Sequence, residues 1–166
     1  MCLVIFVVLP READGAAVER VFAAHQLGFR VVENPVLGAR LADGDFIVST
    51  ETAGCDCHTP LGVRPLDVEA VTAQMRAAGV SDGKIAVRLT QLRAQESARQ
   101  RASVTVETWR AAISQALAHT PRIGVLLHWF NGNIATEDIA FSRQPGTLDV
   151  AYLAGLAKDT LHEFVA

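Results

Sequence analysis

The amino-acid sequence predicts an α+β fold, with a small, largely antiparallel sheet and helices mainly on one face. A continuous apolar run at residues 2–9 is typical of a buried strand, and residues 123–130 are the second strong strand candidate. Strands come mostly first, then helices, then strand and helix again, an order that favours α+β over a regular βαβ array. The length of 166 residues, without an internal repeat or a linker, predicts a single domain over residues 1–166.

The first part of the chain is expected to contain strands around one helix. The run at residues 2–9 is too short for a typical helix, and Pro10 ends it. Asp14 is placed to cap a helix that reaches about residue 25. Short strands bounded by turn residues then follow at 29–33, 36–41 and 46–50.

The middle of the chain is expected to be helical. Asp67 is placed to cap a helix that ends near Gly79, and a second helix covers residues 82–100. Either Ser103 or Thr105 caps a third helix, in which apolar residues repeat at helical spacing.

The last part of the chain is expected to return to the sheet and to end in a helix. The strong strand at 123–130 runs into a turn at 131–133. A short adjoining strand is predicted at 138–142. Asp149 then caps a final helix, whose apolar stripe extends to Phe164.

Composition excludes several classes of protein. Half of the residues are hydrophobic and 20% are charged, which is typical of a compact globule. The net charge of -3 predicts no attraction to nucleic acid. No apolar run approaches the roughly 18 residues that a membrane span needs. Three cysteines and the lack of a signal-peptide pattern predict a cytoplasmic protein.

A cysteine-histidine cluster is the strongest candidate for a functional site. Cys55, Cys57 and His58 lie in a loop between Gly54 and Gly62. Two thiolates and an imidazole suit zinc, and a pair of thiols also suits nucleophilic or redox chemistry. The alternative is a purely structural loop, in which small thiols pack beneath a tight turn.

A structural zinc site needs four ligands, and this loop offers three at most. The remaining ligand would come from Cys2, from His128 or from an acidic residue such as Asp56. Cys2 opens the first strand and His128 lies near the end of another, so antiparallel pairing would bring them to the same edge of the sheet.

Cys2 is also a candidate on its own, because removal of the initiator methionine would give it a free amine beside its thiol. The Met-Cys start resembles that of glutamine amidotransferases and related hydrolases, and it implies an N-terminal cysteine nucleophile. Leu3 stands where the amidotransferases have glycine. The alternative is that Cys2 simply begins a buried strand.

A second resemblance covers residues 50–62, Thr-Glu-Thr-Ala-Gly-Cys-Asp-Cys-His-Thr-Pro-Leu-Gly. This segment resembles a Cys-Asp-Cys-Gly-Thr-x-Leu-Gly pattern in uncharacterised bacterial proteins. The later His128-Trp129 pair is similar to a His-Trp pair near the end of a strand in the same proteins. The resemblance implies a bacterial protein and no particular activity. His58 stands where the pattern has glycine, which argues against His58 as an essential ligand.

Two hypotheses of function follow from the sequence. The first is a metal- or thiol-dependent protein that uses Cys55 and Cys57, with His58, Cys2 and His128 as further candidates. The second is a non-catalytic protein-protein interaction module, such as a toxin-neutralising or regulatory partner, whose surface complementarity a sequence does not reveal. An N-terminal cysteine hydrolase is the lesser alternative.

Overall fold

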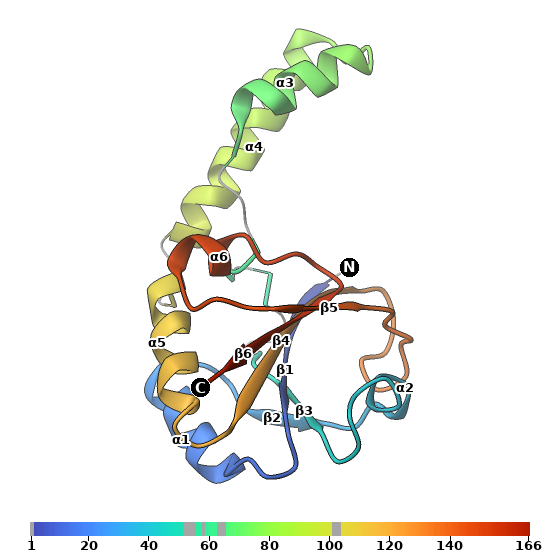
Figure 1. Cartoon of the computed structure of the whole chain (residues 1–166). Helices are drawn as coiled ribbons and strands as arrows, with labels where there is room; N and C mark the ends of the chain where they lie inside the picture. The colour runs from blue at the N-terminus through green and yellow to red at the C-terminus, as the bar shows by residue number, and fades with distance from the viewer. Residues whose placement is uncertain (1, 52–55, 58, 63–65, 101–103) are drawn as a thin grey trace. The chain divides into compact units, whose positions relative to one another are not determined.

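The computed structural model describes residues 2–51, 56–57, 59–62, 66–100 and 104–166 (Figure 1). Contacts divide the chain into two compact units, Met1–Val63 with Ser103–Ala166 and Arg64–Ala102. The prediction of a single domain over 1–166 is not tested by this division, because two contact units can belong to one domain.

The first unit is built on one sheet with the strand order β2-β3-β1-β4-β6-β5. Its strands are β1 (Cys2–Leu9), β2 (Arg30–Val32), β3 (Phe46–Ser49), β4 (Arg122–Phe130), β5 (Ser142–Pro145) and β6 (Thr160–Val165). Every neighbouring pair is antiparallel except β5 and β6, which run parallel. The predicted α+β class and largely antiparallel sheet are therefore confirmed.

The helices of the first unit are α1 (Gly15–Ala24), α2 (Pro35–Gly38), α5 (Val106–Ala116) and α6 (Val150–Ala154). Alternate residues of β1 point to opposite faces of the sheet and build two core clusters. Leu3 and Ile5 join a cluster that contains residues of α1, α5 and α6. Val4 and Phe6 join a second cluster, to which α2 contributes Leu37. Helices thus contact both faces, so the prediction of helices mainly on one face is not confirmed.

Contrary to the prediction, the sheet is not small, because six strands join it in the described residues. Two of the differences are local. Residues 36–41 were expected as a strand, but α2 begins there because the Asn34 side chain accepts the backbone N–H of Leu37 and Pro35 occupies the first turn. The predicted strand at 138–142 is instead β5, which begins only at Ser142.

The final helix is also much shorter than predicted. Asp149 caps α6 as expected, but the helix ends at Ala154 beside Gly155. The chain then forms β6, in which Leu161 pairs with Leu126 and Phe164 with Ile123 of β4. Apolar residues that fit a helical stripe in the sequence therefore belong to a strand.

The second unit contains α3 (Val68–Ala77), capped by Asp67, and α4 (Asp82–Gln100), as predicted. Gly79 has a φ of 73° in the turn between them, a conformation that suits glycine. No residue of α3 is buried, and Ile85 of α4 is 4% exposed. Among the helices of the described residues, none is long and apolar enough to cross a membrane.

Candidate functional site

The described part of the cysteine loop completes the edge of β1. Strand β3 pairs with β1 only from Phe6 to Leu9. Beyond that point, the backbone N–H of Asp56 donates to the Leu3 carbonyl at 2.8 Å. The Asp56 carboxylate accepts the Ile5 N–H at 2.8 Å, and the Cys57 sulfur accepts the Leu3 N–H at 3.3 Å. Asp56 and Cys57 therefore take over the hydrogen bonds that a longer β3 would have made.

Burial changes the acidity of Asp56. Desolvation raises the pKa of this carboxyl from 3.8 to about 6, the Ile5 N–H opposes that change, and the negative charge of Glu51 adds to it. Asp56 thus combines a structural hydrogen bond with a carboxyl group that titrates close to neutral pH.

The predicted site residues lie on two different faces of the sheet. Cys57 packs against the cluster that contains Leu3, on the face of α1 and α5. Cys2 and His128 lie on the other face, because they alternate with Leu3 and Trp129 along β1 and β4. His128 is therefore on the face opposite the core cluster that Cys57 contacts. The Cys57 sulfur itself lies at the strand edge, where it accepts from Leu3, the residue after Cys2. Cys55 and His58 lie outside the described residues.

Within the residues that the structure describes, no group of three or more His, Cys, Asp or Glu side chains could hold a metal ion. The prediction of zinc at Cys55, Cys57, His58 and His128 stays untested in full, because two of the four residues are not described. His128 and Cys57 on opposite faces cannot share one ion.

His128 lies between two carboxylates. Its Nδ1 is 2.6 Å from Asp159 Oδ1, and its Nε2 is 3.3 Å from Glu137 Oε1. The carboxylates face opposite nitrogens of the ring, so they do not converge on a point where an ion could bind. Both nitrogens can donate at once only when the ring is protonated. His128 is thus placed as a link between β4, the 131–137 turn and the residue before β6.

Glu137 in turn holds the backbone of that turn. Its Oε2 accepts the N–H groups of Asn131 at 3.3 Å and Gly132 at 3.1 Å. Desolvation acts to raise the pKa of Glu137, but the hydrogen bonds from His128, Gly132 and Asn131 outweigh it, and the pKa is lowered. Glu137 is therefore stabilised as an anion beneath the turn.

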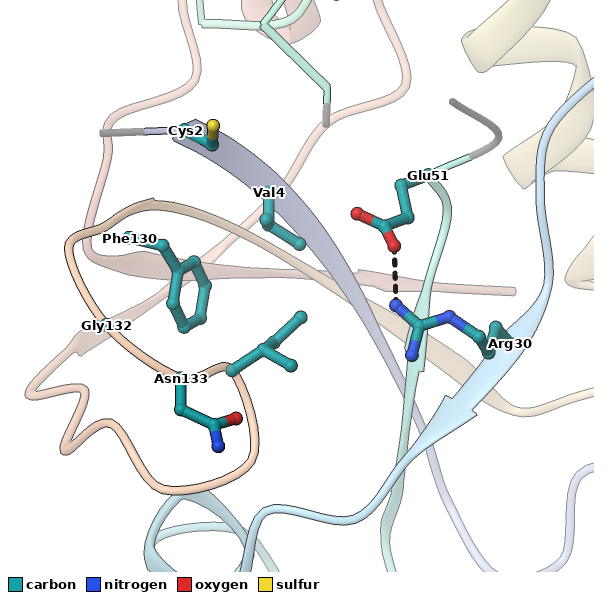
Figure 2. Close-up of a pocket in the computed structure, with 8 residues that line it drawn as sticks. Cys2, Val4, Arg30, Glu51, Phe130, Gly132 and Asn133 are labelled. Atoms are coloured by element: carbon teal, nitrogen blue, oxygen red, sulfur yellow. Dashed lines mark hydrogen bonds and ion pairs between the residues drawn. The ribbon is translucent and has the colours of Figure 1, made fainter. Parts of the chain in front are cut away.

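A pocket of about 480 Å³ opens on the face of Cys2 (Figure 2). Its lining comes from β1, β2, the end of β3, the end of β4 and the following turn. The lining residues are Cys2, Val4, Arg30, Glu51, Phe130, Gly132, Asn133 and Ile134. Cys2 is exposed and reaches this pocket from the first residue of β1. Cys2, one of the thiols predicted as reactive, thus lines a pocket.

The pocket has one charged side and one apolar side. Arg30 Nη2 lies 2.6 Å from Glu51 Oε1, with side chains 53% and 19% exposed. Figure 2 shows this ion pair on one side, with Phe130, Gly132 and Asn133 on the other. The pocket can therefore accept a molecule with an apolar middle and a polar end.

Sequence reasoning missed Arg30, Glu51, Asn133, Glu137 and Asp159. Arg30 lies within one predicted short strand and Glu51 directly follows another, and no motif marks either residue. Antiparallel pairing of β2 with β3 puts Arg30 opposite Ser49 and so brings it beside Glu51. The Asn131-Gly132-Asn133 turn was predicted. This turn signal was the one feature of the sequence that could have indicated a wall of the pocket.

Comparison of the chain with family models, with curated proteins and with solved structures finds no match.

Proposed function

We propose that this is a thiol-dependent protein in which Cys2 exchanges with a small disulfide bound in the pocket. The observation that supports the proposal is an exposed thiol that shares a pocket of about 480 Å³ with an ion pair and an apolar wall. An exposed thiol is accessible to an attacking or leaving partner, whereas a thiol packed among aliphatic side chains is not.

The reaction is a thiol-disulfide exchange. The Cys2 thiolate attacks one sulfur of the bound disulfide, a new sulfur-sulfur bond forms, and the original one breaks. The departing half leaves as a thiolate and takes a proton from water. Cys2 is oxidised to a mixed disulfide while one sulfur of the ligand is reduced to a thiol, so electrons balance within the two reactants.

Cys57 provides a matched internal comparison. Its sulfur accepts the N–H of Leu3 at the edge of β1, and its half-buried side chain packs against a core cluster. The same chain therefore carries one thiol that lines a pocket and one that supports a strand edge. Exchange with a small disulfide should distinguish them.

The test is to incubate the reduced protein with glutathione disulfide and to locate the adduct by peptide mass spectrometry. The proposal expects an adduct on Cys2 that Cys2→Ser removes and that Cys57→Ser and Cys55→Ser retain. Modification of Cys57 or Cys55 in place of Cys2 would overturn it. Steady hydrolysis of an amide or ester by Cys2, with no mixed disulfide, would favour the hydrolase alternative.

Zinc binding through the cysteine loop is tested separately. Metal analysis of protein purified without a histidine tag would show about one zinc per chain if Cys55 and Cys57 are ligands. That zinc should be lost in the Cys55→Ser, Cys57→Ser double variant. A metal-free wild-type protein would remove this hypothesis and leave exchange at Cys2 unaffected.

The interaction-module hypothesis is favoured by a different observation. Among the described side chains of the second unit, Ile85 is buried, while Val87 of the same helix is 59% exposed. A helical pair that buries so little apolar surface gains stability from a binding partner. A stoichiometric complex that Val87→Asp abolishes, without loss of helix content, would support this second function.

A further inference from the structure

We propose that the Arg30–Glu51 ion pair selects disulfides whose ends carry both an ammonium and a carboxylate group, that is, amino-acid or small-peptide disulfides. The inference rests on the proposed exchange at Cys2 and adds the chemistry of the ligand. Its basis is the charge arrangement in the pocket, where one cation and one anion lie 2.6 Å apart.

The ion pair leaves donors and acceptors for a ligand. An arginine guanidinium has five N–H donors, and Nη2 uses one of its two towards Glu51 Oε1. A ligand carboxylate can accept from other N–H groups of Arg30, which is 53% exposed. The second carboxylate oxygen of Glu51 can accept from a ligand ammonium group.

The balance of charge disfavours ligands of a single sign. A ligand with only carboxylates is attracted by Arg30 but repelled by the negative charge of Glu51. A ligand with only ammonium groups is attracted by Glu51 but repelled by Arg30. A zwitterionic end satisfies both side chains, because each of its charges lies next to the opposite charge.

The other side of the pocket fits the rest of such a molecule. Val4 and Phe130, 4% and 6% exposed, line this side together with half-buried Ile134, and methylene groups and a polarisable disulfide can contact these apolar side chains. Cys2 lines the same pocket as the ion pair, so a disulfide bound by its charged end can extend along the pocket towards the thiol. The arrangement thus separates recognition of the ligand's end from reaction at its middle.

The experiment compares four small disulfides: cystine, cystamine, dithiodipropionate and hydroxyethyl disulfide. The first has zwitterionic ends, the second only ammonium groups, the third only carboxylates, and the fourth no charge. The rate of mixed-disulfide formation at Cys2 is divided by the rate with an unstructured peptide that contains one cysteine. This ratio removes the intrinsic reactivity of each disulfide.

The expected ratio for cystine exceeds the other three by about tenfold, the effect of one good charge-assisted contact. Glu51→Gln should move the preference towards dithiodipropionate, and Arg30→Gln towards cystamine. Arg30→Lys keeps the positive charge and should retain the preference for cystine. Circular dichroism of each variant checks that the edge of the sheet remains folded.

The outcomes separate the two proposals. Equal ratios for all four disulfides, with Cys2 still modified, would overturn the zwitterion inference and leave the exchange function standing. If Cys2 reacted with none of them in the folded protein yet reacted after unfolding, the exchange function itself would fail. A preference for cystine that both glutamine variants leave unchanged would show that other residues recognise the ligand.

Discussion

The Asp56 carboxylate accepts the backbone N–H of Ile5 at 2.8 Å, so a side chain takes the position of a strand carbonyl on the edge of β1. This contact explains why an acidic residue sits between the two cysteines of the loop. It also explains the altered acidity of Asp56, because the carboxyl must be buried to reach the strand.

Asp56→Asn should remove a pH dependence of stability. The folded-state pKa of about 6 lies above the ordinary value of 3.8, so the unfolded chain loses this proton first and wild-type stability falls as pH rises from 4 to 6. Asparagine keeps a carbonyl oxygen for Ile5 but cannot ionise. Relative to wild type, the variant should gain about 2 kcal/mol between pH 4 and pH 7. Chemical denaturation at both values measures this difference, and a constant difference would contradict the assignment.

Glu137→Gln should loosen the turn that forms one wall of the pocket. The anion accepts from Asn131, Gly132 and His128, and its pKa is lowered, so its contribution is present at neutral pH and is lost as pH falls. The variant should lose about 1 kcal/mol at pH 7 and much less once the pH is low enough to protonate Glu137 in the folded protein. Denaturation curves give the energy, and hydrogen exchange of the Asn131 and Gly132 amides gives the location. Unchanged exchange at those amides would count against a role for Glu137 in the turn.

Gly62→Ala should destabilise the protein. Gly62 has a φ of 63°, and an added Cβ would lie 2.7 Å from Leu127 Cδ2 and 2.7 Å from the Leu156 carbonyl oxygen. We expect a loss of about 1–3 kcal/mol from the combined backbone strain and steric overlap. Gly38→Ala is the matched control, because nothing lies within 4 Å of its added Cβ. Thermal melts of the two variants measure the contrast, and equal melting temperatures would disprove it.

Asn34→Asp should keep the cap of α2 but remove the hydrogen bonds that join Asn34 to the turn before β5. The Asn34 side chain accepts from Leu37 and donates to the carbonyls of Ile134 at 2.9 Å and Glu137 at 3.2 Å. Aspartate keeps the acceptor but turns two donors into acceptors that face carbonyls in a buried position. The expected cost is about 2–3 kcal/mol.

Exchange at Cys2 should also slow in this variant, since Ile134 lines the pocket. Asn34→Ser keeps the cap through a hydroxyl and forms no repulsive contact, so it should lose less stability than Asn34→Asp. The rate of adduct formation and the denaturation midpoint together test this order.

The sequence predicted well those elements whose signals are local. The apolar composition of β1 and β4 was sufficient to predict them as buried strands. Asp14, Asp67 and Asp149 cap helices as expected. Thr105 proved to be the cap of α5. A capping side chain acts within three residues of its own position, so the neighbouring sequence is sufficient to reveal it.

Cys2 and His128 were predicted as candidates, but their surroundings depend on contacts across the sheet. Arg30 and Glu51 form an ion pair only because β2 aligns against β3, and His128 meets Asp159 only because β6 aligns against β4.

Burial patterns and local hydrogen bonds were sufficient to predict the fold class, the two long strands and the starts of most helices. Contacts across the sheet were needed to show that residues 160–165 form a strand, that Cys57 and His128 contact different faces, and that Cys2 shares a pocket with an ion pair. Strand pairing joins residues far apart in the chain, and its register sets which face each side chain occupies.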